Sequence, residues 1–123
     1  MKSFLKMLFV AGVFAGVSVV SLAVVQEDAQ AEPVEASYYG YELAGSLTAS
    51  GQPFDPTALT AAHKTLPLGT QLLVTYGGNS VVVTVNDRGP YVAGRDLDLS
   101  QAAAEQIGLT AAGSGVVDMQ VIE

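Results

Sequence analysis

Residues 70–86 read TQLLVTYGGNSVVVTVN and contain the two most strand-like runs of the chain. Residues 70–76 and 80–86 are rich in Leu, Val, Thr and Tyr, residue types that favour β-strands. The sequence GGN at residues 77–79 separates them and predicts a tight three-residue hairpin turn. The stretch therefore predicts an antiparallel strand pair in a mainly β protein.

Shorter strands are expected on both sides of this hairpin. The runs are ASYYGY, ALTAA, RDLDL and VVDMQVI, at residues 36–41, 58–62, 95–99 and 116–122. Ser100 is suited to cap the N-terminus of a short helix over residues 101–107, and Gly108 is suited to end it. Five or six short strands and one small helix indicate a compact β-barrel with an inserted helix.

The N-terminal quarter has the composition of an export signal. Two lysines precede the uncharged residues 7–25, and the sequence AQA follows at residues 29–31. This order predicts a signal peptide over residues 1–31, so that the folded domain, residues 32–123, works outside the cytoplasm. The alternative is an uncleaved membrane anchor, because the apolar run is just long enough to span a bilayer.

Charge and cysteine content exclude several classes of protein. Residues 32–123 contain 10 acidic and 3 basic residues, which leaves the net charge at −7. Nucleic acid is therefore excluded as a partner, because neutralising phosphates requires basic patches. The chain has no cysteine, so neither a disulfide nor a thiolate site is expected. His63, the one histidine, has no partner ligand, and no metal or cofactor is expected.

Taken one at a time, the polar residues have ordinary structural interpretations. Asp87 in the sequence NDRGP is adjacent to Arg88, and such a pair is most often a surface ion pair. His63 alone is best interpreted as a structural or capping histidine. Asp96 and Asp98 are expected to orient loops or to cap the helix. Only the combination of motifs indicates a functional site.

Four motifs, in this order, resemble the rare lipoprotein A (RlpA) family of bacterial cell-wall proteins. They are TASGQPFD, TAAHKTLPLGT, VNDRGP and GRDLDLS, at residues 48–55, 60–70, 85–90 and 94–100. The resemblance extends from Ala36 to the C-terminus. It implies a six-stranded double-psi β-barrel related to expansins, in the periplasm, in the cell envelope or secreted, that binds peptidoglycan. Characterised members of the family are lytic transglycosylases that cut glycan strands.

The resemblance also implies the residues of the site. Asp87 falls on the acidic residue of the NDRGP motif and would be the catalytic acid, and His63 falls on the groove histidine. Substrate-binding positions are implied at Tyr38, Tyr39, Thr48, Ser50, Gln52 and Arg88. One acid suffices for a transglycosylase, because the C6 hydroxyl of the substrate replaces the activated water of a hydrolase. We expect strand alternation to direct Asp87 and Arg88 to opposite sides, and His63 to bond Asp87 or hold the sugar.

Departures from the family pattern leave alternatives open. Gln52 replaces a common acid, Tyr38 replaces a tryptophan, and neither a lipid-attachment cysteine nor a repeat domain after Glu123 is present. Gln52 and the acidic surface favour a non-catalytic, expansin-like glycan-binding barrel. A two-carboxylate hydrolase would need a second acid among Asp55, Asp96 and Asp98. A monomer is expected, with membrane attachment only if residues 1–31 remain uncleaved.

Overall fold

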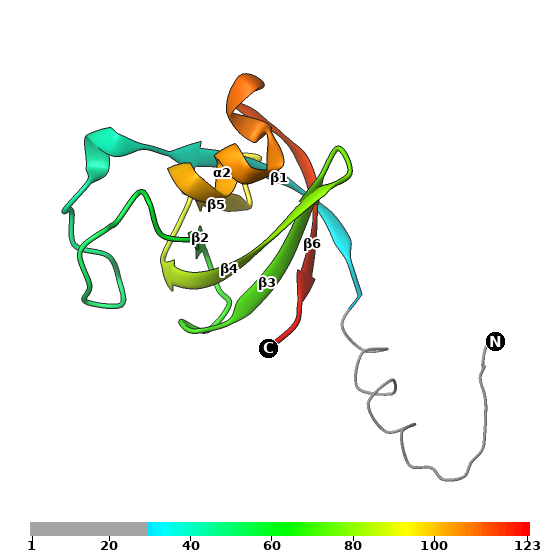
Figure 1. The fold of residues 1–123 in the computed structure, drawn as a ribbon. Coiled ribbons are helices and arrows are strands. Elements are labelled where there is room, and N and C mark those ends of the chain that lie inside the picture. The colour runs from blue at the N-terminus through cyan, green and yellow to red at the C-terminus, as the bar shows by residue number, and fades with distance from the viewer. Residues whose placement is uncertain (1–29) are drawn as a thin grey trace, which may run out of the picture. The chain divides into compact units, whose positions relative to one another are not determined.

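Six strands close into a barrel in the computed structural model, which describes residues 30–123. The order around the barrel is β1-β5-β2-β4-β3-β6 (Figure 1). The strands are β1 Glu32–Tyr39, β2 Thr60–His63, β3 Gln71–Tyr76, β4 Asn79–Asp87, β5 Leu97–Ser100 and β6 Ser114–Val121. The predicted six-stranded barrel is confirmed. The predicted signal peptide lies outside the described residues, apart from its last two positions.

Two of the strand pairs in the barrel are parallel. β1 runs parallel to β5 and β2 runs parallel to β4, while every other neighbouring pair is antiparallel. Parallel strands cannot be joined by a tight hairpin, so each of these pairs depends on a connection that crosses the barrel. This mixed closure is the arrangement expected of a double-psi β-barrel.

The hairpin between β3 and β4 has a two-residue turn, one residue shorter than predicted. Tyr76 pairs with Asn79, so Asn79 is the first residue of β4 and not part of the turn. Gly77 and Gly78 form the turn with φ values of 57° and 87°. A type I′ turn, which matches the strand twist, needs positive φ at both central positions, and glycine adopts it without steric cost.

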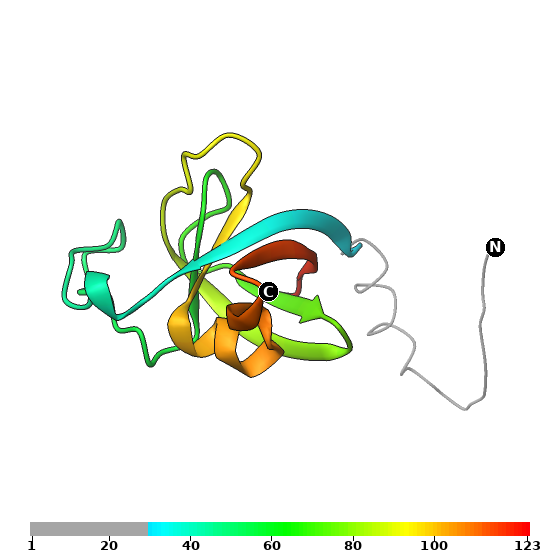
Figure 2. The ribbon, with the colours of Figure 1, turned by 90° about the horizontal axis from the view of Figure 1, so that it is seen from above.

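The barrel interior is filled by alternate residues of the strands. Its fully buried side chains include Leu72, Val74, Val83, Val85, Leu97 and Leu99. Helix α2 (Gln101–Ile107) follows β5 directly, lies on the opposite side of the barrel from residues 88–96 (Figure 2), and adds Ala103, Ala104 and Ile107 to the core. Short 3-10 helices, η1 (Tyr41–Leu43) and η2 (Leu109–Ala111), complete the fold.

The helix begins and ends as the sequence predicted. Ser100 Oγ accepts a hydrogen bond from Ala103 N, and Gly108 ends the helix with a φ of 81°. Ser100 also donates to Ala58 O at 2.7 Å, so the cap ties the helix to the segment before β2. Within residues 30–123, no helix has both the length and the apolar character needed to cross a membrane.

Candidate active site

Strand β2 brings two aspartates to the outer face of the barrel. Ala62 pairs with Asp87 of β4 on one side and with Asp98 of β5 on the other. The preceding residue, Ala61, pairs with Val85, and both are fully buried in the core. Because successive side chains alternate across a strand, Ala62 and its two aspartate partners share the opposite, outer face.

A β-bulge in β4 places Asp87 on this outer face. Val85 pairs with Ala61 and Asp87 pairs with Ala62, so Asn86 has no position of its own in the ladder. Without the bulge, Asp87 would continue the inward-facing series of β4. An extra residue reverses the alternation and re-aims the side chain that follows it, which is a recurrent device beside active sites.

The Asp87 carboxyl group is held at one of its two oxygens. Oδ1 accepts hydrogen bonds from Ala49 N at 2.9 Å and from Arg88 N at 2.8 Å. Within the described part of the chain, no donor bonds Oδ2. Asp87 is half-buried, so Oδ2 is the oxygen left to interact with a ligand.

The loop that supplies the Ala49 amide is fixed by its own polar residues. Thr48 is buried and its hydroxyl donates to Gln52 O at 2.6 Å, and it also lies 2.9 Å from Ser50 Oγ. Ser50 N donates to Asn86 O at 3.1 Å, which attaches the loop to β4 beside the bulge. Thr48, Ser50 and Gln52 therefore lie in the same loop as Ala49, which bonds Asp87, and the Ser50 and Gln52 side chains are exposed.

Asp98, which the sequence offered only as one of three candidate second carboxylates, lies on this face. Ser100 caps the helix alone, and the Asp98 carboxyl group accepts a hydrogen bond from Ser37 Oγ at 2.9 Å. Burial raises the pKa of Asp98, the Ser37 bond and Arg95 lower it, and the Asp87 charge raises it, with a net increase. Asp98 therefore keeps its proton to a higher pH than an ordinary aspartate does. The alternation of RDLDL in the sequence already indicated that this side chain points away from the leucines.

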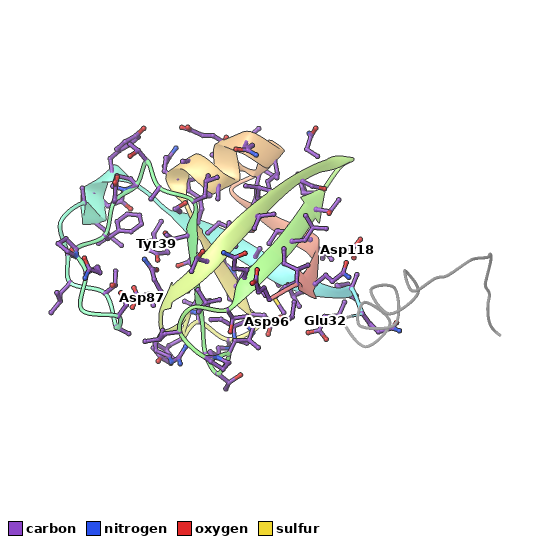
Figure 3. The ribbon with its side chains drawn as sticks, turned by 60° about the horizontal axis from the view of Figure 1, so that its bottom comes forward. Glu32, Tyr39, Asp87, Asp96 and Asp118 are labelled. Atoms are coloured by element: carbon purple, nitrogen blue, oxygen red, sulfur yellow. The ribbon has the colours of Figure 1, made fainter. Side chains whose placement is uncertain are left out.

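The other two candidate second carboxylates have local structural roles. Asp55 accepts both the backbone N–H of Thr57 at 2.9 Å and its hydroxyl at 2.7 Å, and these bonds lower the pKa of the exposed Asp55 carboxyl. Asp96 accepts Glu35 N at 3.3 Å. Figure 3 shows Asp96 well apart from Asp87. Asp98 is therefore the second carboxylate that the structure brings beside Asp87.

Tyr39 covers the same face from β1. Its ring stacks on Phe54 with centroids 4.4 Å apart and forms a small apolar cluster with Ala62 and Phe54. The Tyr39 hydroxyl is buried without a hydrogen-bond partner in the described residues. Burial, and then the charges of Asp87 and Asp98, raise the pKa of Tyr39, so the hydroxyl stays protonated. Figure 3 shows Tyr39 and Asp87 on the same side of the barrel.

Replacing Tyr39 by phenylalanine is expected to increase the free energy of unfolding by about 1 kcal/mol, because a buried hydroxyl without a partner is removed. Urea unfolding of Tyr39→Phe measures the change. Tyr41→Phe is the matched control, since Tyr41 is 61% exposed and its substitution should leave stability unchanged. A clear loss of stability in Tyr39→Phe would show that the hydroxyl has a bonding partner in solution.

His63 has hydrogen-bond partners other than Asp87. His63 follows Ala62 and lies on the opposite side of β2. Its Nδ1 accepts backbone N–H bonds from Thr65 and Leu66, both at 3.1 Å, so the proton of the neutral ring is on Nε2. Burial lowers the pKa of His63, and Asp96 partly opposes this effect. No hydrogen bond joins His63 and Asp87, both of which the structure describes.

Arg88 and Tyr38 also point away from the two aspartates. Arg88 Nη1 donates to His63 O at 3.1 Å and to Leu66 O at 2.8 Å, so only the backbone N–H of Arg88 contacts Asp87. The expectation that the Asp87 and Arg88 side chains diverge agrees with these bonds. Tyr38 packs against the main core, on the other side of β1 from Tyr39.

In residues 30–123, no group of three or more His, Cys, Asp or Glu side chains is arranged to hold a metal ion.

The closed six-stranded barrel with its two parallel strand pairs is that of a double-psi β-barrel protein, and its outer face carries Asp87 and Asp98. A protein-family model described as lytic transglycolase matches residues 31–121. The chain belongs to this family, the RlpA-type double-psi β-barrels, as the four sequence motifs predicted.

Curated relatives from other bacteria agree with this assignment. The chain is 49% identical over 90 residues to the "Probable endolytic peptidoglycan transglycosylase RlpA" of Synechocystis, covering 72% of this chain and 28% of that protein. It is 50% identical over 90 residues to the "Endolytic peptidoglycan transglycosylase RlpA" of Pasteurella multocida, covering 72% of this chain and 31% of that protein. The chain thus matches less than a third of the length of these relatives.

Solved structures share the fold at lower identity. The Streptomyces papain inhibitor aligns with a TM-score of 0.61 and 24% identity, covering 76% of this chain and 96% of the inhibitor. An expansin from Clavibacter michiganensis aligns with a TM-score of 0.62 and 23% identity, covering 76% of this chain and 51% of the expansin. At this identity the likeness establishes the barrel fold alone.

Proposed function

We propose that the protein is an endolytic peptidoglycan transglycosylase with Asp87 as its general acid. The observation that carries the proposal is the orientation and hydrogen bonding of the Asp87 carboxyl group. A bulge turns the side chain outward, two backbone N–H groups hold Oδ1, and Oδ2 is left without a protein partner. Family membership and relatives named for this activity support the same reaction.

The proposed reaction needs one proton and no water. The Asp87 carboxyl gives its proton to the glycosidic oxygen, and the bond between that oxygen and the sugar C1 breaks. The C6 hydroxyl oxygen of the same sugar bonds to C1 and closes an anhydro ring. Its proton returns to the Asp87 carboxylate, which restores the acid. No cofactor takes part, and the atoms of the substrate are conserved in the two products.

We assign His63 and Arg88 supporting roles in this reaction. The neutral His63 ring holds the turn at Thr65 and Leu66, and carbonyl groups of this segment hold the Arg88 guanidinium group. The backbone N–H of Arg88 in turn bonds Asp87 Oδ1. His63 would therefore act on Asp87 through the backbone that it orders, as a positioning residue.

Glycan binding is proposed for the exposed polar side chains of Ser50 and Gln52, which lie in the loop that contacts Asp87. Tyr39, whose hydroxyl is buried, would support this face through the packing of its ring on Phe54. The resemblance also implies Tyr38 as a substrate-binding residue. Tyr38 would act indirectly, because its side chain packs against the barrel core. A protein with this substrate would work in the periplasm or cell envelope, or be secreted, after export by the predicted signal peptide. We propose that it acts as a monomer that binds peptidoglycan strands and not nucleic acid.

Mass spectrometry of peptide-free glycan strands incubated with the purified protein tests the proposal. Anhydro-muramyl ends are the expected products, because the substrate's own hydroxyl group closes the ring. New reducing ends would mean that water attacks instead, and the reaction would be hydrolysis. Strands that remain intact under conditions where a known transglycosylase cuts them would overturn the proposed activity.

The alternative function is a non-catalytic, glycan-binding barrel, and Gln52 favours it. Gln52 lies in the loop whose Ala49 amide bonds Asp87, and a side-chain amide cannot exchange a proton as a carboxylic acid does. This alternative predicts that the protein sediments with insoluble cell wall while the strands stay intact. A protein that binds no wall preparation would contradict it.

A further inference from the structure

We propose that Lys64 and Arg95 form a binding site for the free carboxylate of the muramic acid units in a glycan strand. The proposal deepens the proposed function and rests on it, because it names the chemical group that a strand bound at Asp87 must carry. Neither the sequence patterns nor the resemblance gave Lys64 or Arg95 a role in substrate binding.

The strand order brings the cations of the folded domain to one edge of the barrel. β2 is parallel to β4 and antiparallel to β5, so β2 and β4 end at the edge where β5 begins. Asp87 is the last residue of β4. Lys64 directly follows β2, Arg88 directly follows β4, and Arg95 lies two residues before β5. A glycan strand bound at Asp87 therefore lies at the edge that carries all three basic residues of residues 32–123.

Hydrogen bonds hold these three cations, here called the basic edge, close together. Lys64 Nζ donates to Arg95 O at 2.7 Å. Arg88 Nη1 donates to His63 O and to Leu66 O, on either side of Lys64 in the chain. The turn after β2, the end of β4 and the segment before β5 are therefore joined at the basic edge.

The acids of the domain leave the basic edge unpaired. Within residues 30–123, no ion pair joins Lys64, Arg88 or Arg95 to a carboxylate. Lys64 is exposed, and its bond to Arg95 O uses one of its three ammonium protons. The side chain of Arg95 is half-buried and donates no hydrogen bond to another described residue. Lys64 and Arg95 therefore keep donors for an anionic ligand.

The charge of Arg95 acts on the face that carries Asp87. Burial raises the pKa of Asp98, and the Arg95 charge opposes this increase. Asp98 in turn lies across Ala62 from Asp87 on the outer face. The Arg95 guanidinium group is therefore beside the position of a strand whose glycosidic oxygen lies at Asp87.

The chemistry of the strand identifies the anion. Each muramic acid unit carries a lactyl carboxyl group, which is a neutral amide when a stem peptide is attached and an ionised carboxylate when it is not. The net charge of −7 repels a strand of such carboxylates at long range, so its binding needs a local cation site. Guanidinium and ammonium groups form charge-assisted hydrogen bonds to carboxylates. The basic edge therefore suits strands whose muramic acid carboxyl groups are free.

Steady-state kinetics on two forms of the same peptide-free strands test the proposal in the full-length protein. One form keeps the muramic acid carboxylates as its only anionic groups, and in the other they are converted to neutral amides. On the carboxylate form, Arg95→Gln and Lys64→Gln should each raise KM about two- to fivefold, the effect of an exposed ion pair, with kcat unchanged. On the amide form, the wild type should show the raised KM, and neither substitution should raise it further.

Gln106→Glu is the matched control, because it lowers the net charge by one, as Arg95→Gln does. Gln106 is exposed on α2, on the opposite side of the barrel from residues 88–96 (Figure 2), and its substitution should leave KM unchanged. An equal rise in KM in this control would show that only the net charge matters. A rise in Arg95→Gln on the amide form as well would show a structural role. Either result, or an unchanged KM in both cation variants, would overturn the proposal.

Equilibrium binding to an Asp87→Asn background separates this proposal from the proposed function. Binding of the carboxylate strands should weaken when Arg95→Gln is added and when the salt concentration rises. If binding depends on Lys64 and Arg95 but the wild type releases no anhydro ends, the proposed activity is refuted and the carboxylate site stands. If the wild type cuts the strands but binding ignores both cations, the carboxylate site alone is refuted.

Discussion

Asp87→Asn will lower the rate of glycan cleavage by roughly 10²–10⁴-fold, the contribution typical of a general acid, while leaving the barrel folded. The amide oxygen of asparagine can still accept the N–H groups of Ala49 and Arg88 that hold Oδ1 in the native protein. What the amide cannot do is give a proton to the glycosidic oxygen and take one back from the C6 hydroxyl. The expected loss is therefore chemical and not structural.

The measurement is the initial rate at which anhydro-muramyl ends are released, with thermal unfolding of the same samples as the check on folding. Asp118→Asn makes the same chemical change at an exposed residue of β6 and should cut at the wild-type rate. If Asp87→Asn cuts as fast as the wild type, Asp87 is not the acid. If it is inactive but also unfolded, the rate says nothing of the chemistry, so the folding check is read first.

Leu99→Ala will have the largest effect on stability, a loss of about 2–5 kcal/mol in the free energy of unfolding. Leu99 is fully buried, and it pairs with Tyr38 of β1 on one side and Ala61 of β2 on the other. Truncation leaves a cavity at the centre of a four-residue strand that joins two parts of the barrel. Small domains have total free energies of unfolding of about 5–15 kcal/mol, so this substitution would remove a large part of the stability of the barrel.

The urea midpoint and its slope measure this loss. Val82→Ala is the matched control, because Val82 is 42% exposed on β4 and should change stability by less than about 0.5 kcal/mol. A loss below about 1 kcal/mol in Leu99→Ala would mean that the barrel closes around the missing side chain. Because Asp98 precedes Leu99, a destabilised variant should also show an altered Asp98 titration.

His63 and Asp98 show what a motif leaves undecided. Both lie in family-like motifs next to buried residues, and the resemblance implied His63, not Asp98, as a catalytic residue beside Asp87. In the structure, His63 bonds the turn that follows β2, and Asp98 lies across Ala62 from Asp87. A motif indicates that a residue is close to a site, but strand register decides which residues face each other.

Local physics accounts for what could be predicted from the sequence. The alternation of apolar residues in β4 and β5, the helix cap at Ser100 and the stop at Gly108 depend only on near neighbours. Two paired glycines were enough to predict a hairpin, though not its length. The resemblance of the motifs added the six-stranded barrel, which the structure confirms, and the hypothesis that Asp87 is the acid.

Only the tertiary structure decided which residues meet at the site. β2 lies between β4 and β5, its partners in the barrel, although long segments of chain separate it from each of them. Such pairings are chosen by the closure of the whole core, and no local pattern encodes them. The bulge at Asn86 likewise has no mark in the run SVVVTVND, because it is imposed by the register of the parallel neighbour, β2. These two features turn Asp87 outward and place Asp98 across Ala62 from it.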